Sequence, residues 1–196
     1  MALHTREALE RMGFATLGDD IQVSVLASFH GISRIALGHR VRIDDFCVLS
    51  AGAGGISLGR HVHIVAFCSL VGAGKITMED FSGLASRVSI YSSNDDYSGA
   101  FMTNPTVPAT YTGVQHADVF CGRHVIVGTG SVILPGSTLE EGAAIGALSL
   151  VNRNCQAFGI YAGRPVRRLG DRKRQLLELE KRFLAAQGDS GKDPCP

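Results

Sequence analysis

The chain contains 196 residues, of which 45% are hydrophobic and 19% are charged, and its formal net charge is +1. This length fits one domain with a sizeable core, and the near-neutral charge argues against a nucleic-acid-binding protein, because phosphate affinity is built from clustered cations. No apolar run approaches the roughly 18–20 residues of a membrane-spanning helix, and the start of the chain lacks a secretory apolar stretch, so we expect a soluble, cytoplasmic protein.

The chain begins with a predicted lead-in segment, residues 1–20, in which residues 5–13 form a short amphipathic helix that ends at Gly13. A repeat then occupies residues 21–168, which we expect to form one domain. Glycine accounts for 24 of the 196 residues, well above its usual share of roughly 7%. Because these glycines are scattered through apolar sequence, they predict many tight corners.

A six-residue period is the main signal in this domain. Aliphatic residues, Met or Cys recur at every sixth position, and the residue four places further on is mostly small or β-branched. The recurring large positions are Leu37, Ile43 and Leu49; Leu58, Ile64 and Leu70; Met78, Leu84 and Ile90; and Cys121, Val127, Ile133, Leu139, Ile145 and Val151. This period matches neither an α-helix nor a long alternating strand.

The period predicts an all-β solenoid. Each short strand would place one large and one small side chain inside before the chain turns a corner, and three strands would complete one coil. The spacing from Cys121 to Leu139 is one such coil of 18 residues. Neighbouring coils would pair through backbone hydrogen bonds. Some coils are longer, and their extra residues fall in the glycine-rich bends 51–55 and 72–75.

Two further segments depart from the repeat. Residues 94–118 are predicted to form a polar loop ejected from the solenoid, with enough aromatic residues and prolines to be ordered. Residues 169–187 are assigned to a C-terminal segment, in which residues 171–187 form an amphipathic helix. We expect residues 188–196 to be a disordered tail.

The five cysteines show no Cys-x-x-Cys pair and no zinc-site spacing. Three of them fall at positions that the repeat predicts to point inward. We therefore expect reduced, buried, small hydrophobic residues in place of a disulfide framework, and no bound metal.

Three stretches near the end of the repeat, residues 124–136, 145–153 and 161–168, closely follow the closing coils of a known family. Through them the chain resembles the hexapeptide-repeat acyltransferases. The resemblance implies a left-handed parallel β-helix, a homotrimer and acetyl-coenzyme A as co-substrate, and the handedness rests on the resemblance alone. Residues 80–86 and 91–99 are similar to a branch of this family that acylates sugars or nucleotide-linked amino sugars for bacterial surface polysaccharide.

The implied activity is transfer of the acetyl group of acetyl-coenzyme A to an amino or hydroxyl group of a sugar. A dTDP-linked amino sugar used in lipopolysaccharide synthesis is the expected acceptor. The residues do not distinguish nitrogen from oxygen as the acceptor atom, because both need a base. A β-helix offers grooves between the flat faces of adjacent subunits, so we expect an active site shared by two chains.

The resemblance also implies which positions contact the coenzyme. They are Ile126, Gly128, Thr129, Ala147, Asn152, Arg153, Tyr161, Gly163 and Arg167. Small residues there would let the pantetheine lie against the backbone, and the cations gathered over residues 153–173 would hold its phosphates. The alternative is that the small residues only serve corner geometry and that the cations form a solvated face.

The general base is less clear from the sequence. Many sugar acetyltransferases of this family carry a catalytic His shortly after the third coil, and the aligned position here is Asp95. We expect His63 to be the base, with Asp95 or Asp96 of the adjacent chain orienting its imidazole or binding the sugar. His116 is the second candidate. A non-catalytic His63 and an ordinary turn at Asp95 and Asp96 are the alternatives.

Three other histidines, His39, His61 and His124, recur at a coil corner, and this repetition predicts a structural surface role. The sequence leaves two alternative functions open. One is a β-helical carbonic anhydrase with zinc held by three His across a subunit interface; we expect His61 and His63 to point to different sides, which counts against it. The other is a catalytically idle trimeric scaffold, because the usual family His is missing.

Overall fold

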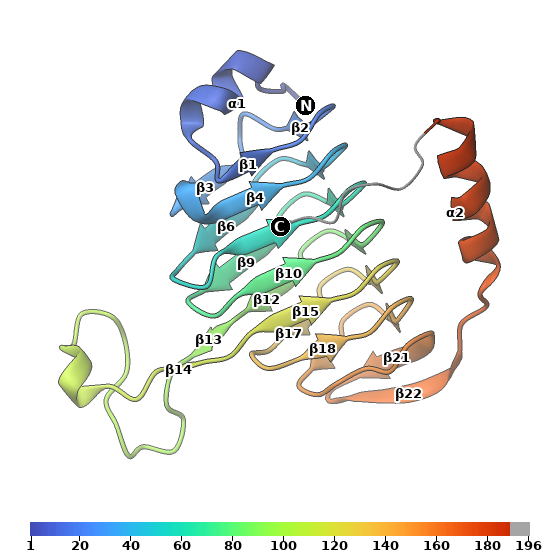
Figure 1. Ribbon diagram of the computed structural model, residues 1–196. Helices are drawn as coiled ribbons and strands as arrows, with labels where there is room; N and C mark the ends of the chain where they lie inside the picture. The colour runs from blue at the N-terminus through green and yellow to red at the C-terminus, as the bar shows by residue number, and fades with distance from the viewer. Residues whose placement is uncertain (189–196) are drawn as a thin grey trace.

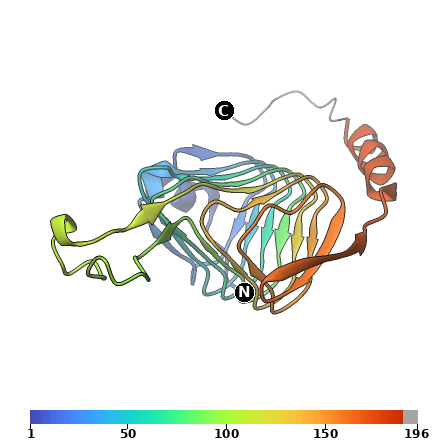
Figure 2. The same ribbon diagram turned by 90° about the horizontal axis from the view of Figure 1, so that it is seen from below.

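Short strands follow one another around three flat faces, and each turn of the chain stacks on the turn before it (Figure 1). The computed structural model describes residues 1–188. Seen from below, the successive coils are nested (Figure 2). Adjacent coils pair in parallel, as Ile76 and Met78 do with Ile56 and Leu58 of the preceding coil. The predicted all-β solenoid is confirmed.

Each face of the solenoid is one sheet. Sheet 1 contains β1 (Thr16–Leu17), β4 (Ile35–Leu37), β7 (Ile56–Leu58), β10 (Ile76–Met78), β15 (Val119–Cys121) and β18 (Thr138–Leu139). Sheet 2 contains β2 (Gln22–Val23), β5 (Arg42–Ile43), β8 (His63–Ile64), β11 (Gly83–Leu84), β16 (Ile126–Val127), β19 (Ala144–Ile145), β21 (Gly159–Gly163) and β22 (Val166–Asp171). Sheet 3 contains β3 (Ser28–His30), β6 (Val48–Ala51), β9 (Ser69–Gly72), β12 (Ser89–Tyr91), β17 (Val132–Ile133) and β20 (Leu150–Val151).

The core is the interior of this prism, and the repeat predicts it correctly. All fifteen large repeat positions from Leu37 to Val151 are buried, with exposed fractions of 3% or less. The small positions between them, such as Cys68, Ser131 and Ala143, are buried as well. A flat coil leaves room inside for only one large and one small side chain per strand, and close packing of these pairs stabilises the stack.

Residues with positive φ turn the corners. Between sheets 1 and 2 they include Arg40, His61, Phe81, His124 and Phe158, and between sheets 2 and 3 they include Phe46, Phe67, Arg87, Gly130 and Leu148. The left-handed conformation gives the tight turn that a short corner needs.

These corner positions correct one prediction about the histidines. His61 and His124 share a corner position, but the corresponding residue of the earlier coil is Arg40, not His39. His39 precedes that position, and its Nδ1 accepts a hydrogen bond from the backbone N–H of Asp19 at 3.0 Å.

One helix precedes the strands of the solenoid and one follows them. α1 (Arg6–Met12) begins after Thr5, whose hydroxyl accepts a hydrogen bond from the backbone of Ala8, and ends at Gly13 with φ of 80°, as predicted. α2 (Gln175–Ala186) begins later than expected, because β22 continues to Asp171 as an antiparallel hairpin with β21. Apart from Gly188, the predicted disordered tail lies outside the described residues.

A linker over residues 172–174 joins β22 to α2. The guanidinium of Arg172 donates to the backbone carbonyls of His124 and Gly142 at 2.7 and 3.0 Å. This contact holds the linker against the solenoid, so the helix cannot begin there.

The segment over residues 94–118 leaves the body after β12, as predicted, and projects into solvent (Figures 1 and 2). Its neck is an antiparallel pair of β13 (Ser93–Asn94) and β14 (Gln115–His116), and it contains the short 3-10 helix η2 (Ala109–Tyr111); a second one, η1 (Ile32–Arg34), precedes β4. Tyr97 is 87% exposed. The aromatic residues of this loop therefore do not pack on the face of their own solenoid.

Four cysteines, Cys47, Cys68, Cys121 and Cys155, are free and buried, as expected, whereas Cys195 lies outside the described residues. Burial raises the pKa of the Cys121 thiol to about 12 and that of Cys155 to about 11. Within residues 1–188, no helix has the length and apolar character needed to span a membrane.

Candidate active site

His63 and Asp44 form a hydrogen-bonded pair on the outer face of sheet 2. His63 lies in β8, and its Nε2 is 3.0 Å from Oδ2 of Asp44, which follows β5 in the preceding coil. Arg42 donates to the other carboxylate oxygen of Asp44 at 2.8 Å. The Asp44 side chain is only 13% exposed, whereas the His63 side chain is 44% exposed and open to a ligand.

The environment of Asp44 keeps it ionised. Burial raises the pKa of this carboxyl, but hydrogen bonds from Arg42 and His63 and their positive charge outweigh burial, so the pKa lies below its ordinary value. An ionised Asp44 accepts the Nε2–H of His63, and this contact leaves Nδ1 as the ring nitrogen that can exchange a proton with a ligand. Among residues 1–188, no hydrogen-bond partner occupies that Nδ1. The arrangement can therefore accept a proton from a bound substrate.

Asp44 was not among the residues singled out from the sequence. The expected carboxylate was Asp95 or Asp96 of an adjacent chain, but the His63 imidazole is already held by a carboxylate of its own chain. The sequence carried one usable signal: Asp44 and His63 are 19 residues apart, close to one coil, and so they occupy nearby places on adjacent coils.

The ejected loop carries the other predicted catalytic residues away from their own His63. His116 lies in the neck of the loop, where its Nδ1 is 2.8 Å from the Ser93 hydroxyl. Asp96 closes a turn, accepting hydrogen bonds from the Ser98 hydroxyl and from the backbone of Gly99 and Phe101. These bonds lower the pKa of Asp96.

Asp95, next to this turn, is exposed. The loop projects from the edge between sheets 3 and 1, whereas His63 lies on sheet 2 (Figure 2). One chain therefore does not bring the predicted base and the loop carboxylates together.

The corner between sheets 2 and 3 borders the His63 face and presents small polar residues. The Ser86 and Thr129 hydroxyl oxygens are 3.0 Å apart, and Thr129 donates to the backbone carbonyl of Ser86 at 2.6 Å. Ala147 stands one coil further on. At Gly128 an added Cβ would lie 2.5 Å from the Ala147 backbone nitrogen, so coil packing alone accounts for that glycine.

An aromatic ladder continues along the same corner. The rings of Phe46 and Phe67 are stacked with centroids 5.0 Å apart, and the Arg87 guanidinium lies 4.8 Å from the Phe67 centroid. Both rings are about half exposed. The corner thus combines an apolar, cationic segment with the hydroxyls of Ser86 and Thr129.

The predicted coenzyme-contacting residues of the last coils differ in their availability. Tyr161 is buried, and its hydroxyl accepts a hydrogen bond from the Gln156 backbone at 2.9 Å, so its side chain is structural. Gly163 turns the hairpin between β21 and β22 with φ of 107°. Asn152, Arg153 and Arg167 are exposed.

Most of the cations at this end of the solenoid already bind other groups of the chain. Arg172 binds backbone carbonyls, and burial lowers its pKa. Arg164 donates to the Leu148 carbonyl at 2.7 Å, and Arg168 pairs with Asp171. Within the described chain, the side chains of Arg153 and Arg167 make no hydrogen bond, so these two remain available for phosphates.

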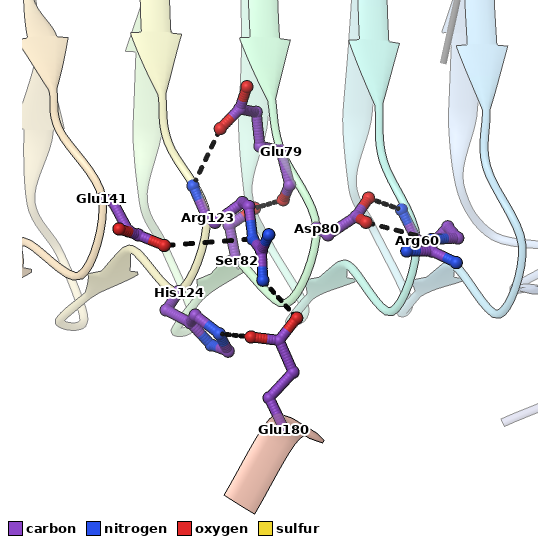
Figure 3. A network of polar contacts seen from close by, with 8 residues as sticks. All are labelled: Arg60, Glu79, Asp80, Ser82, Arg123, His124, Glu141 and Glu180. Atoms are coloured by element: carbon purple, nitrogen blue, oxygen red, sulfur yellow. Dashed lines mark hydrogen bonds and ion pairs between the residues drawn. The ribbon is translucent and has the colours of Figure 1, made fainter. Parts of the chain in front are cut away.

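The second aromatic ladder, at the corner between sheets 1 and 2, is covered by α2. His61, Phe81 and His124 stack with centroids about 5 Å apart, and Phe183 of α2 lies edge-on against the first two. Glu180 of α2 pairs with Arg123 and, at 2.8 Å, with His124 Nε2 (Figure 3). His61 and His124 are structural, as predicted, but they lie under α2 and not on a free surface.

The described residues contain no group of three His, Cys, Asp or Glu side chains that could hold a metal ion. His61 and His63 have separate partners, because the corner at His61 turns the chain between them. A groove of about 820 Å³ on the outer face of sheet 1, lined by residues such as Ser57, Thr77 and Arg60, contains none of the predicted site residues.

No model of a known protein family matches the chain, but individual proteins do. It is 49% identical over 183 residues to the dTDP-4-amino-4,6-dideoxy-D-glucose acyltransferase of Escherichia coli. The aligned region covers 93% of this chain and 95% of that protein. Nodulation protein L of Rhizobium meliloti is 28% identical and covers 78% of both chains.

Solved structures agree. AntD, an N-acyltransferase from Bacillus cereus solved with dTDP and 3-hydroxybutyryl-CoA, superposes with a TM-score of 0.90 at 37% identity, covering 95% of this chain and 98% of AntD. A hexapeptide-repeat acetyltransferase of Vibrio cholerae shares the fold at 18% identity, with a TM-score of 0.62 over 86% of this chain and 77% of that chain. This chain belongs to the hexapeptide-repeat acyltransferases, enzymes with a left-handed parallel β-helix that draw their acyl group from an acyl-coenzyme A.

Proposed function

We propose that this enzyme transfers an acetyl group from acetyl-coenzyme A to the amino group of a dTDP-linked 4-amino-4,6-dideoxy sugar. The observation that carries the proposal is the His63–Asp44 pair, a base with an ionised partner on the open face of a β-helix. The acceptor class is supported by the name of the Escherichia coli relative and by AntD complexes with dTDP-4-amino-4,6-dideoxyglucose and coenzyme A. Because AntD is an N-acyltransferase, nitrogen is favoured over oxygen.

The reaction needs one proton to leave the acceptor before attack. A sugar amine that arrives as an ammonium ion loses a proton to Nδ1 of His63, while Asp44 stabilises the imidazolium. The free amine attacks the thioester carbonyl, and the new C–N bond forms as a tetrahedral intermediate. This intermediate collapses and the C–S bond breaks. The departing sulfur takes one of the two protons left on the nitrogen, and the other stays on the amide, which gives the amide and free coenzyme A.

Ser86 is a further candidate for the reacting site. AntD has been solved as variants of one serine and one aspartate that are ten residues apart. In this chain only Ser86 and Asp96 show a serine followed by an aspartate at that separation. The Ser86 hydroxyl, fixed beside Thr129, could donate to the developing oxyanion.

The coenzyme would lie along the corner between sheets 2 and 3. Its pantetheine would pass Ile126, Thr129 and Ala147, where the side chains are small or apolar, and its phosphates would meet the exposed Arg153 and Arg167. Asn152 borders the same end, and Gly128, Tyr161 and Gly163 shape the backbone around it.

We propose a homotrimer in which the loop of one chain completes the site of the next. The outer face of sheet 3 supports this, because its partly or fully exposed side chains include Val71, Tyr91 and Leu134. Exposed apolar side chains at neighbouring places on one sheet are typical of a subunit interface. The projecting loop would then place Asp95 beside the neighbour's His63 as a sugar-binding residue.

A cytoplasmic role in bacterial surface polysaccharide synthesis follows from the proposed substrates, since acyl-coenzyme A and nucleotide sugars are cytoplasmic metabolites. A 25% identical Escherichia coli relative is named as a putative lipopolysaccharide biosynthesis O-acetyl transferase.

The test is release of free coenzyme A from acetyl-coenzyme A with dTDP-linked amino sugars, free amino sugars and hydroxyl sugars as acceptors. We expect turnover with the dTDP-linked amino sugar and its loss in His63→Ala. The His116→Ala variant is the control for the second candidate base and should keep its activity. Turnover that His63→Ala leaves intact would contradict the assignment of the base.

A mixed-oligomer experiment tests the shared site. His63→Ala and the double variant Asp95→Asn, Asp96→Asn would each be inactive alone. When the two are co-expressed, one interface of the mixed trimer holds an intact His63 and an intact loop, so activity should return. Mixtures without activity would argue that both groups act within one chain.

A further inference from the structure

Gly83 lies in the middle of sheet 2 at a position where glycine is unfavourable. It begins β11 and pairs with His63 of β8 on one side and with Ile126 of β16 on the other. A glycine in a strand offers no side chain to pack and weakens the strand. It is commonly found where a ligand or another backbone comes close.

Coil packing does not explain this glycine. Gly38 and Gly128 have no room for a side chain, because an added Cβ would lie 2.6 and 2.5 Å from backbone atoms of the next coil. Among the atoms of residues 1–188, an added Cβ at Gly83 would meet only the His63 carbonyl oxygen, at 3.7 Å, which is an ordinary contact. Its φ is not positive either. The backbone at this position would accept alanine.

The missing side chain leaves a notch in the outer face of sheet 2. His63 forms one wall, with its side chain 44% exposed, and Ile126, which is 50% exposed, forms the other. Neighbouring strands lie roughly 4.8 Å apart, so the notch is about one strand wide. Asp44 lies on the β5 side of His63, away from the notch. The imidazole therefore has its carboxylate on one flank and open space on the other.

We propose that the Gly83 notch receives the ring of the acceptor sugar, so that its amino group meets His63. The inference rests on the proposed function, because the base must come within hydrogen-bond reach of the amine it deprotonates. A side chain at position 83 would occupy the space of the ring and push the amine away. Gly83 is thus a specificity-determining position for the acceptor.

The experiment compares Gly83→Ala and Gly83→Leu with wild-type enzyme. We expect the KM for the dTDP-linked amino sugar to rise several-fold in the first variant and about 100-fold in the second. The KM for acetyl-coenzyme A and the Kd for dTDP, which lacks the sugar ring, should stay within about twofold. Gly170→Ala is the matched control: Gly170 lies in β22 with no atom within 4 Å of its added Cβ.

Each other outcome overturns the inference in a distinct way. An unchanged acceptor KM in Gly83→Leu would show that the notch is empty during catalysis. A raised KM for acetyl-coenzyme A alone would assign the notch to the thioester. Loss of the oligomer, measured by sedimentation, would assign it to a neighbouring chain. Failure of the proposed function would already appear as absent turnover in the wild-type enzyme, before any variant is compared.

Discussion

The His63–Asp44 pair depends on two residues that lie far apart in sequence and adjacent in space. Asp44 is 3.0 Å from Nε2 of His63, and Arg42 donates to the other oxygen of the Asp44 carboxylate, which favours its ionised form. A catalytic imidazole needs this kind of support, since the partner sets both the tautomer and the orientation of the ring.

We predict that Asp44→Asn lowers kcat about 10- to 100-fold. The amide cannot balance the positive charge that the imidazole gains when it takes a proton from the substrate. The control is Asp45→Asn, which removes a neighbouring carboxylate that accepts from Ser24 and does not contact His63. Equal kcat values in the two variants would contradict a positioning role for Asp44.

The same pair predicts a pH-dependent contribution to stability. Burial raises the pKa of Asp44, but hydrogen bonds from Arg42 and His63 outweigh it, so the pKa is lower in the folded chain than in the unfolded one. Such a carboxylate stabilises the fold above its unfolded pKa of about 3.9, and this contribution is lost as the pH falls through the lower folded value.

Urea denaturation of wild type and Asp44→Asn measures this contribution. We expect the wild type to be more stable by about 1–3 kcal/mol at pH 7, and the difference to shrink as the pH is lowered below the folded pKa of Asp44. A difference that stayed constant down to pH 2 would show that the carboxylate charge is not its source.

The coils and the C-terminal helix α2 are stabilised by different contacts. Coils are stabilised by their own core and by the next coil, whereas α2 depends on a few side chains. Glu180, whose side chain is 8% exposed, contacts Arg123 and His124, and Phe183 packs on the ring ladder. Loss of the Glu180 charge removes its ion pair with Arg123, whose side chain is 43% exposed, and weakens its contact with His124.

We therefore predict that Glu180→Gln releases α2 from the solenoid while the coils stay folded. Trypsin should then cleave the basic linker over residues 172–174 at least tenfold faster than in wild type. Glu178→Gln is the matched control, because Glu178 makes only an exposed ion pair with Lys181. Equal cleavage rates in both variants would show that the Glu180 contacts do not hold the helix.

The sequence period predicted which side chains of the strands point inward, but the sequence did not predict where α2 begins. The inward positions, such as Leu70 and Ile133, follow directly from the six-residue period, because each strand has only one inward place for a large residue. The start of α2 was wrong, since residues 166–171 pair with β21. That pairing joins two segments through a tight hairpin and leaves no periodic signal in the sequence.

At the scale of the whole molecule, the loop that carries Asp95 and Asp96 leaves the solenoid between sheets 3 and 1, whereas His63 lies in sheet 2. The outer face of sheet 3 exposes apolar side chains such as Val71 and Tyr91. Both features are accounted for by the proposed homotrimer, in which sheet 3 is covered and each loop reaches a neighbour.

We predict that Val71→Glu dissociates the trimer and abolishes activity, because it buries an unpaired charge in the proposed interface. Sedimentation should change from three chain masses to one, while far-UV circular dichroism stays unchanged. Thr77→Glu, on the outer face of sheet 1, is the control and should remain trimeric. A trimeric, active Val71→Glu protein would show that sheet 3 is not the interface.

The sequence by itself determined the solenoid, its interior and the place where the loop leaves, because a strict period dictates which side chains face inward. It also pointed to His63 as a base. Only the tertiary structure decided what surrounds His63. The partnership with Asp44, the notch at Gly83 and the covering of His124 by α2 each join residues from different coils or segments, and stacking of the coils, not local sequence, brings them into contact.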